Sequence, residues 1–242
     1  MNPLILIGFL TFVVVALVAG IRLLLLWRRT RQLPELLMGI GILGIGPIGF
    51  GGMMIGVLSK SNPPLANAAF AFGTVAVITG VLAKCVFNWR VYRPRSIAAM
   101  GATCFVVAMM TGIIASNVFD GQWAPTEALA WDTLARSVAQ VGCLLWGSAE
   151  SLRYWSKMKK REKLGLADTV VVNRFLLWGL GAGFAGVGTG IGIAAEVILG
   201  IPALQIPWVV STSSAFGFAA AVAIYLAFVP PQRYVGFIRA RA

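Results

Sequence analysis

The sequence contains no histidine, which is the commonest metal ligand and general base in proteins. This absence excludes a histidine-bound metal or haem, a Ser–His catalytic pair and the chemistry of rhomboid-type membrane proteases. Cysteine is also scarce: Cys85, Cys104 and Cys143 lie in apolar segments without CxxC spacing, which is typical of small buried side chains rather than disulfides. We therefore expect no enzyme activity, no bound metal and no cofactor.

Charged residues make up only 12% of the chain, against about 25% in soluble domains. Hydrophobic residues make up 59%, and the mean hydropathy is +0.86. A bilayer core about 30 Å thick requires roughly 20 apolar residues per helix, and helices satisfy their own backbone polar groups in lipid. Seven runs of this kind predict one all-α transmembrane domain over residues 1–242, a seven-helix bundle with spans at about 3–27, 35–58, 65–89, 96–118, 128–153, 170–198 and 207–229.

Basic residues are concentrated on alternate links between these spans. The links 28–35, 90–95 and 153–168 and the tail carry fifteen of them, whereas Lys60 stands alone on the other links. Cytoplasmic loops of membrane proteins are enriched in Lys and Arg, so this pattern predicts an outside N-terminus and a cytoplasmic C-terminus. Because the first run is long and its arginines follow it, we expect it to remain as a span rather than to be removed as a signal peptide.

The net charge of +12 suggests several kinds of partner. We expect no nucleic acid, because the basic residues flank membrane spans and no soluble fold is there to present them. The tail 232–242 alternates basic and apolar residues, and is expected either to lie on membrane lipids as a short amphipathic helix or to be a frayed end. The basic 153–168 loop is the expected docking surface for a cytoplasmic or membrane protein partner, and an oligomer is a further alternative.

Small residues and one proline mark two of the spans. Glycines at steps of four, three and four residues line one face of span 170–198, where they favour close helix packing, either inside the bundle or at a dimerising surface; they are Gly179, Gly183, Gly186 and Gly190. Pro47 lies among glycines in the middle of span 35–58. Proline removes an intrahelical hydrogen bond, so it predicts a kink that could act as a hinge or as the wall of a pocket.

Charged residues within spans are costly and normally face the interior with a partner. Lys84, Glu150 and Arg174 are expected at similar depths in the cytoplasmic third of their spans. Glu150 is the one acid at that level, and we expect it to pair with Lys84 or Arg174 as an inner polar lock. Such a lock either fixes the register of the helices or takes part in a switch or a proton-linked step.

A second polar group is expected in the outer half of the bundle. Asp132 and Arg136 are four residues apart and stack on one helix face, which Gln140 continues inward. With acidic and hydroxyl side chains of the next two spans, they form a candidate ligand-binding vestibule: Asp132, Arg136, Gln140, Glu196, Ser211, Thr212, Ser213 and Ser214. The alternative is that the hydroxyl groups only bind carbonyl groups of their own helices.

Two segments carry a resemblance to known proteins: RTRQLPELL at 29–37, and LGLAD at 164–168 followed by NRFLLWG at 173–179. They resemble a group of uncharacterised bacterial seven-helix proteins, and the overall layout is similar to the seven-helix sensor modules of bacterial signalling proteins. The resemblance implies a multi-pass protein of the cell inner membrane with a sensory role. Both segments also suit helix starts, with Pro34 in a first turn and Asp168 as an N-cap.

Three functions fit this sequence. The leading hypothesis is a receptor-like or sensory protein that binds a small or lipidic ligand and relays the change through the kinked span to a cytoplasmic partner. A small transporter would instead need a continuous polar path between the Asp132/Arg136 level and the Glu150 level. A structural or assembly subunit would associate through the glycines of span 170–198. Span 207–229 has no lysine, and the DRY and NPxxY motifs are absent, which excludes opsins and animal G-protein-coupled receptors.

Overall fold

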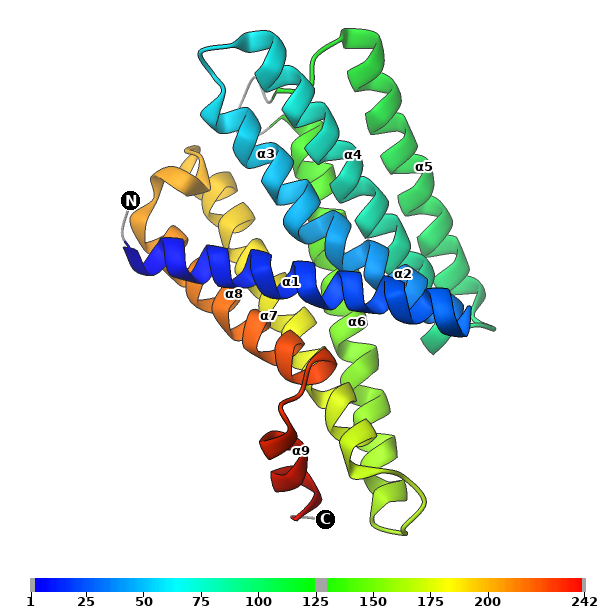
Figure 1. Ribbon diagram of the computed structural model, residues 1–242. Helices are drawn as coiled ribbons and strands as arrows, with labels where there is room; N and C mark the ends of the chain where they lie inside the picture. Colours follow the sequence, from blue (N-terminus) through cyan, green and yellow to red (C-terminus); the bar gives the residue numbers. More distant parts are fainter. Residues whose placement is uncertain (1–2, 125–129, 241–242) are drawn as a thin grey trace.

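The computed structural model describes residues 3–124 and 130–240, and all regular structure in these ranges is helical, which confirms the all-α class. Figure 1 shows the helices, coloured in their order along the chain. They are α1 (Pro3–Thr30), α2 (Leu33–Leu43), η1 (Gly44–Ile48), α3 (Gly49–Leu58), α4 (Pro63–Phe87), η2 (Asn88–Tyr92), α5 (Ile97–Asp120), α6 (Trp131–Glu162), α7 (Thr169–Leu199), η3 (Ala203–Gln205), α8 (Pro207–Phe228) and α9 (Gln232–Arg239).

Six segments within the described residues are long and apolar enough to cross a membrane, so this is a multi-pass membrane protein. They are Leu10–Thr30, Leu33–Leu58, Pro63–Tyr92, Ile97–Asp120, Thr169–Leu199 and Pro207–Phe228. Large apolar side chains such as Phe72, Phe105 and Phe119 are exposed on their surfaces. Large apolar side chains exposed in this way are costly in water but are suited to contact with lipid tails.

The predicted crossing at 128–153 falls on α6, which is not among these six segments. Charged and polar side chains, Arg136, Gln140 and Glu150 among them, lower the hydropathy of this helix. Its predicted start at 128 lies outside the described residues, and its end is Glu162 rather than 153. The additional turns contain Lys, Arg and Glu, which are good helix formers in water as well as in a membrane.

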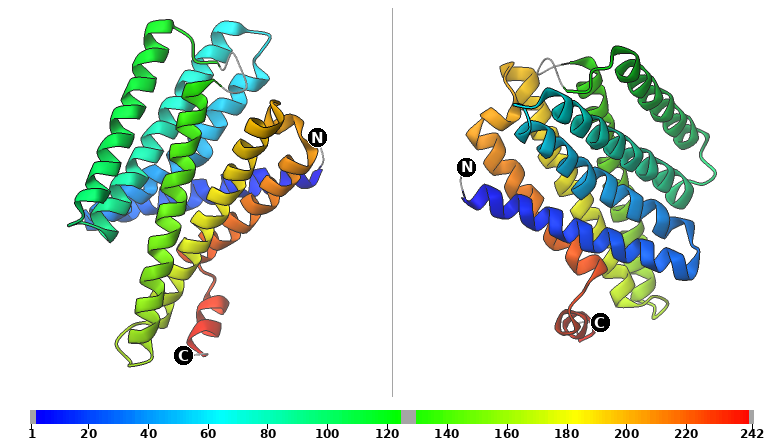
Figure 2. Two further views of the ribbon diagram at one scale, coloured as in Figure 1. Left: turned by 180° about the vertical axis from the view of Figure 1, so that it is seen from behind. Right: turned by 45° about the horizontal axis from the view of Figure 1, so that its top comes forward.

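The helices form two groups that meet at α6. Helices α2, α3, α4 and α5 lie side by side in one group, and α7 pairs with α8 in the other (Figures 1 and 2). Helix α6 packs against both α4 and α7, and α1 crosses from α2 to α8 on the opposite face. The end of α6 and the start of α7 together extend beyond the other long helices, with the short α9 nearby (Figure 2).

The span that contains Pro47 is kinked, as predicted. The kink is the wide π-helical turn η1, in which Gly46 has non-helical dihedral angles of φ −85° and ψ −109°. Helices α2 and α3 on either side of it pack closely on α4. A Cβ atom at Gly44 would lie 2.6 Å from the Ala76 carbonyl oxygen, and one at Gly52 would lie 2.8 Å from the Gly73 Cα. Glycine is therefore required where the backbone of the kinked segment touches that of α4.

Two further sequence features position the ends of helices. Asp168 caps α7, since its Oδ1 accepts a hydrogen bond of 2.7 Å from the Val170 amide, and this confirms its predicted role. The tail is helical as far as Arg239, and α9 is attached to α7 by a 2.9 Å hydrogen bond from Asn173 Nδ2 to the Tyr234 hydroxyl. Helices α7 and α9 are thus held together at one end of the molecule.

Candidate functional site

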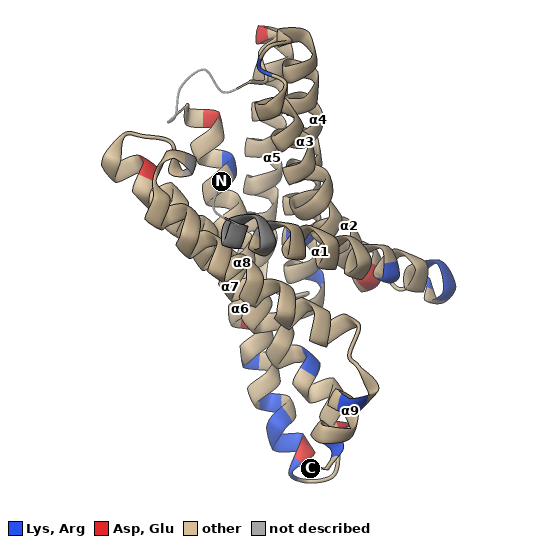
Figure 3. Ribbon diagram, turned by 60° about the vertical axis from the view of Figure 1, so that its left-hand side comes forward, with Lys and Arg blue, Asp and Glu red and all other residues tan. Residues whose placement is uncertain are grey.

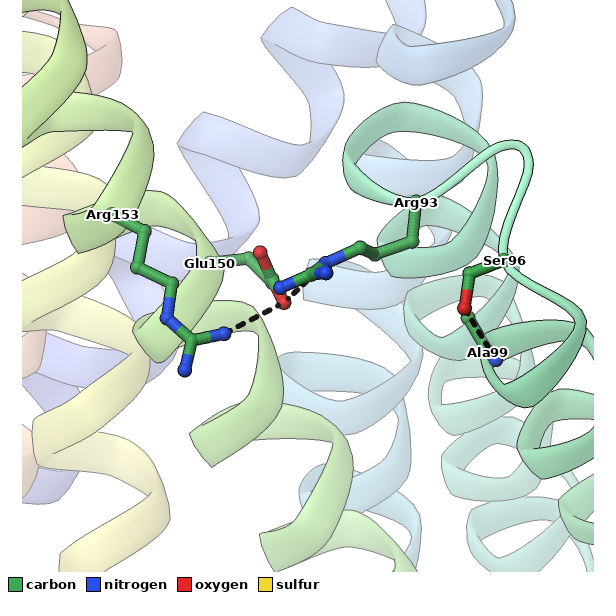
Figure 4. Close-up of polar contacts among 5 residues, drawn as sticks. All are labelled: Arg93, Ser96, Ala99, Glu150 and Arg153. Atoms are coloured by element: carbon green, nitrogen blue, oxygen red, sulfur yellow. Dashed lines mark hydrogen bonds and ion pairs between the residues drawn. The ribbon is translucent and has the colours of Figure 1, made fainter.

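The candidate site is built around Glu150, a buried carboxylate on α6. Its Oε1 accepts hydrogen bonds from Arg93 Nε at 2.9 Å and from Arg153 Nη1 at 3.3 Å. The two arginines reach this oxygen from opposite sides (Figure 4). The Glu150 side chain is 10% exposed, whereas those of Arg93 and Arg153 are 46% and 64% exposed. We call these three residues the arginine–glutamate site, and its formal charge is +1.

Local backbone structure places each member of this site. The turn η2 ends α4, and the chain then reverses at Arg93, whose amide bonds the Trp89 carbonyl at 3.0 Å. Ser96 begins α5 as its N-cap, with its Oγ accepting a 3.2 Å hydrogen bond from the Ala99 amide. Arg153 lies three residues after Glu150, so it shares the same face of α6.

A groove of about 250 Å³ opens beside the arginine–glutamate site, between α5 and α6. It is lined by Arg93, Ser96, Ala99, Ala102, Trp146 and Glu150. The two alanines are small, so the start of α5 leaves space against α6, and α5 packs only lightly on the rest of the bundle. This α5–α6 groove therefore has one charged end and one apolar wall.

Lys84 occupies a separate buried place. Its side chain is 2% exposed, and its Nζ lies 3.8 Å from the centre of the Trp178 ring, 5.8 Å from that of Phe87 and 3.8 Å from Met38 Sδ. A Cβ at Gly41 would lie 2.7 Å from Lys84 Cδ, so this glycine makes room for the side chain. Cation–π contact thus takes the place of an acidic partner where α2, α4 and α7 meet.

The predicted inner polar lock is wrong in its pairing. Within the described residues, Glu150 pairs with Arg93 and Arg153, Lys84 has no ion pair, and Arg174 is exposed. The reason is the rotation of α6: Ser148 and Ser151 face α7, donating hydrogen bonds of 2.7 and 2.8 Å to the Gly179 and Phe175 carbonyls. Glu150, about 100° from Ser151 around the helix, faces η2 instead.

The predicted outer vestibule is divided between different parts of the fold. Arg136 Nη1 donates a 2.7 Å hydrogen bond to the buried hydroxyl of Thr74 and so joins α6 to α4, and Gln140 is buried on the same helix. Glu196 Oε1 accepts from the Ala203 amide at 2.8 Å and thereby orders the turn before α8. The structure therefore gives these polar groups separate roles in packing and in turns.

The hydroxyl groups of α8 mostly bond to nearby backbone. Ser211 donates to the Pro207 carbonyl of its own helix at 2.9 Å, as the alternative interpretation expected. Ser213 donates to the Gly188 carbonyl of α7 at 3.1 Å. Thr212 and Ser214 are half-buried, and the backbone oxygen of Ser214 lies 3.0 Å from where a Cβ at Gly8 would be. Ser213 thus holds α8 to α7, and α1 approaches the backbone of α8 at Ser214.

The four predicted packing glycines of α7 all face α6 inside the chain. Cβ atoms added to them would lie 2.8 Å from Leu152 Cγ, 2.8 Å from Ser148 Oγ, 2.9 Å from Leu145 Cδ2 and 3.7 Å from Val141 Cγ1, for Gly179, Gly183, Gly186 and Gly190 in that order. The stripe therefore serves packing within the bundle, where small residues allow close approach.

This contact makes a prediction about stability rather than about assembly. We expect Gly179→Ala to lower the free energy of unfolding by about 1–2 kcal/mol, because the added methyl group overpacks the contact with Leu152. Gly190→Ala is the matched control, since its Cβ would meet Val141 at an ordinary 3.7 Å. Thermal unfolding in detergent, with size-exclusion chromatography, would check both; a change in assembly size with unchanged stability would contradict the prediction.

Sequence reasoning identified Glu150 but missed its partners and the groove. Arg93 and Arg153 were used only for orientation, although the three-residue spacing of Glu150 and Arg153 was a signal for a pair on one helix face. Trp146 and Trp178 carried no recognisable signal. Comparison of the chain with protein-family models, with curated proteins and with solved structures found no match.

Proposed function

We propose that this is a receptor-like membrane protein that binds a small or lipidic ligand and relays the change to a cytoplasmic partner. In this proposal α6 is a seventh crossing, the N-terminus is outside, the C-terminus is cytoplasmic, and the location is a bacterial inner membrane. The buried polar contacts of α6 support the crossing, because Arg136 bonds Thr74 and Glu150 bonds Arg93 inside the bundle. When the charged side chains of a helix are paired inside the bundle, the free-energy cost of placing that helix in a membrane is small.

The observation that carries the proposal is the continuity of α6. Its 32 residues, at 1.5 Å per residue, make a rod about 48 Å long, which exceeds a bilayer core of about 30 Å. Trp146 and Glu150 of the α5–α6 groove lie on this rod, and its projecting end, residues 153–162, carries most of the basic residues of the predicted 153–168 loop. A ligand that shifts α6 at the groove therefore shifts the end that a partner would contact.

The projecting end offers a basic surface to such a partner. Lys and Arg gather along the end of α6 and on the neighbouring α9 (Figure 3). Lys159 Nζ lies 2.7 Å from Glu162 Oε2, and this hydrogen bond lowers the pKa of Glu162, so the one acid near the end of α6 stays ionised and paired. Among the described residues, Lys157, Lys160 and Arg161 of this end have no ion pair, so they favour an acidic partner surface.

The two alternative functions have less support. Between the polar contacts at Arg136 and at Glu150 lie buried apolar side chains, Val77, Val81 and Leu144 among them, so a transport path there would have to pass the apolar core beside the buried amides of Gln140 and Asn88. The glycines of α7, which an assembly subunit would use, are covered by α6. These contacts favour a relay over a channel or a docking stripe.

Photo-cross-linking in the host cell tests the proposal. A photoreactive residue at Lys160 is expected to capture a cytoplasmic protein reproducibly, while one at Lys60, an exposed lysine predicted at the opposite end, captures none of it. Ala102→Leu, which fills the groove, is expected to change the yield at Lys160 by about fivefold, the lower range of coupling between sites. Capture of no reproducible partner, or a yield unchanged by Ala102→Leu, would overturn the relay.

A further inference from the structure

The α5–α6 groove combines a charged end with an apolar wall, two features that a soluble ligand seldom needs together. Arg93 and Glu150 form one end, and Ala99, Ala102 and Trp146 form an apolar wall. On α5, the residues next to the groove lining include Ile97 and Met100, which are exposed large hydrophobics, 80% and 41% exposed respectively. They give this side of the groove a surface suited to lipid, so its occupant has direct access from the bilayer.

The charged end has unused capacity for an anion. A guanidinium group has five N–H donors. In the described structure Arg93 uses its Nε and Arg153 uses one Nη, both on the same Glu150 oxygen. Glu150 thereby holds the two arginines in place while neutralising only one of them. The remaining charge of +1 matches a single phosphodiester, which guanidinium groups bind through charge-assisted hydrogen bonds.

The start of α5 adds to this positive field. The first amides of a helix have no intrahelical acceptor and carry the positive end of the helix dipole. Ser96 satisfies the Ala99 amide and lies in the groove lining, so the amides of Ile97 and Ala98 are adjacent to the space beside Arg93. Helix starts of this kind favour phosphate groups when basic side chains are also present.

From these contacts we infer that the α5–α6 groove binds an anionic phospholipid, with its phosphate at Arg93 and one acyl chain along Ala99, Ala102 and Trp146. This names the ligand class of the proposed receptor and so rests on the proposed function. Free inorganic phosphate would leave the apolar wall exposed, and a zwitterionic lipid would bring a second cation to a site that is already positive. A groove of about 250 Å³ holds the phosphate, the glycerol and the first part of one chain.

Lipid titration of the purified full-length protein tests this inference. In a neutral detergent, short-chain phosphatidylglycerol is expected to raise the melting temperature in a saturable manner. Phosphatidylcholine with the same chains, and inorganic phosphate, are expected to leave it unchanged. Equal shifts with phosphatidylcholine, or a shift reproduced by inorganic phosphate alone, would overturn the assignment of an anionic lipid.

Variants locate the binding to this groove. Arg93→Gln is expected to weaken phosphatidylglycerol binding at least about tenfold, through loss of a hydrogen bond between charged groups. Lys157→Gln removes the same charge from the same end of the molecule and is expected to preserve binding. Ala102→Leu changes no charge, lies at an exposed position that tolerates a larger side chain, and is expected to abolish binding. Equal loss in the lysine control, or full binding by Ala102→Leu, would contradict the groove.

The inference and the proposed function fail in distinguishable ways. Lipid binding that depends on Arg93 and Ala102 without any partner captured at Lys160 would retain the lipid site and reject the relay. Partner capture by a protein that phosphatidylglycerol does not stabilise would reject the lipid site and retain the relay.

Discussion

Trp178→Ala is expected to reduce the free energy of unfolding by about 3–5 kcal/mol, the range for removing a large buried aromatic side chain. The ring lies 6% exposed in the cluster where α1, α2, α4 and α7 converge. Its centre also lies 3.8 Å from the Lys84 ammonium, as close as Met38 Sδ and closer than the Phe87 ring. The substitution thus opens a cavity and removes the contact that offsets the burial of a charge. Thermal or steric-trap unfolding in one detergent measures the loss.

Lys84→Met separates these two effects. Methionine has a similar length and fills the same space, but it removes the cost of holding an unpaired cation in the interior. We expect the variant to be as stable as the native protein or more stable, by up to about 4 kcal/mol, as seen when buried charges are replaced by apolar side chains. In this background Trp178→Ala is expected to cost less than in the native chain, because no charge is left exposed to the cavity.

Trp178→Phe serves as the control for the ring itself. It keeps an aromatic face above Lys84, although a weaker one, so a loss clearly smaller than that of Trp178→Ala is expected. If Lys84→Met were as destabilising as Trp178→Ala, the cation–π account of this junction would be wrong. A double-mutant cycle with equal costs in both backgrounds would also contradict it.

The helices were predictable from sequence because lipid imposes a simple rule on length and apolarity. The kink at Pro47 and the cap at Asp168 followed from local chemistry that needs no tertiary information. The end of α6 did not, since no change in helix-forming tendency marks the point where a helix leaves the membrane. Because of its charged residues, α6 is also not among the six segments that length and composition alone identify as spans.

The sequence predicted at which depth of the bundle Glu150 lies, but not toward which helix its side chain points. Sequence position placed Glu150 near one end of its helix, and a buried acid there requires a cation. Which cation it meets depends on the rotation of α6, and one residue changes that direction by about 100°. Ser148 and Ser151 fix the rotation through carbonyl groups of α7, and those acceptors exist only in the folded bundle. The pairing with Arg93 therefore required the structure.

Gly44→Leu is expected to be as damaging as the loss of the tryptophan, but by overpacking. A Cβ at Gly44 would lie 2.6 Å from the Ala76 carbonyl oxygen and 2.9 Å from the Gly80 Cα. Both are backbone atoms of α4, so no side chain can turn aside, and the kinked helix has to separate from α4. We expect a loss of about 3 kcal/mol, the upper part of the usual range for overpacked sites.

Gly51→Leu is the matched control on the same kinked segment, because a Cβ there meets nothing within 4 Å. Leucine is a better helix former than glycine by up to about 1 kcal/mol, so this variant is expected to be neutral or slightly more stable. Thermal unfolding of both variants in one detergent measures the difference. Equal stability of the two would mean that η1 and α4 do not touch at Gly44. The close approach that holds Lys84 between these helices and Trp178 would then lose its basis.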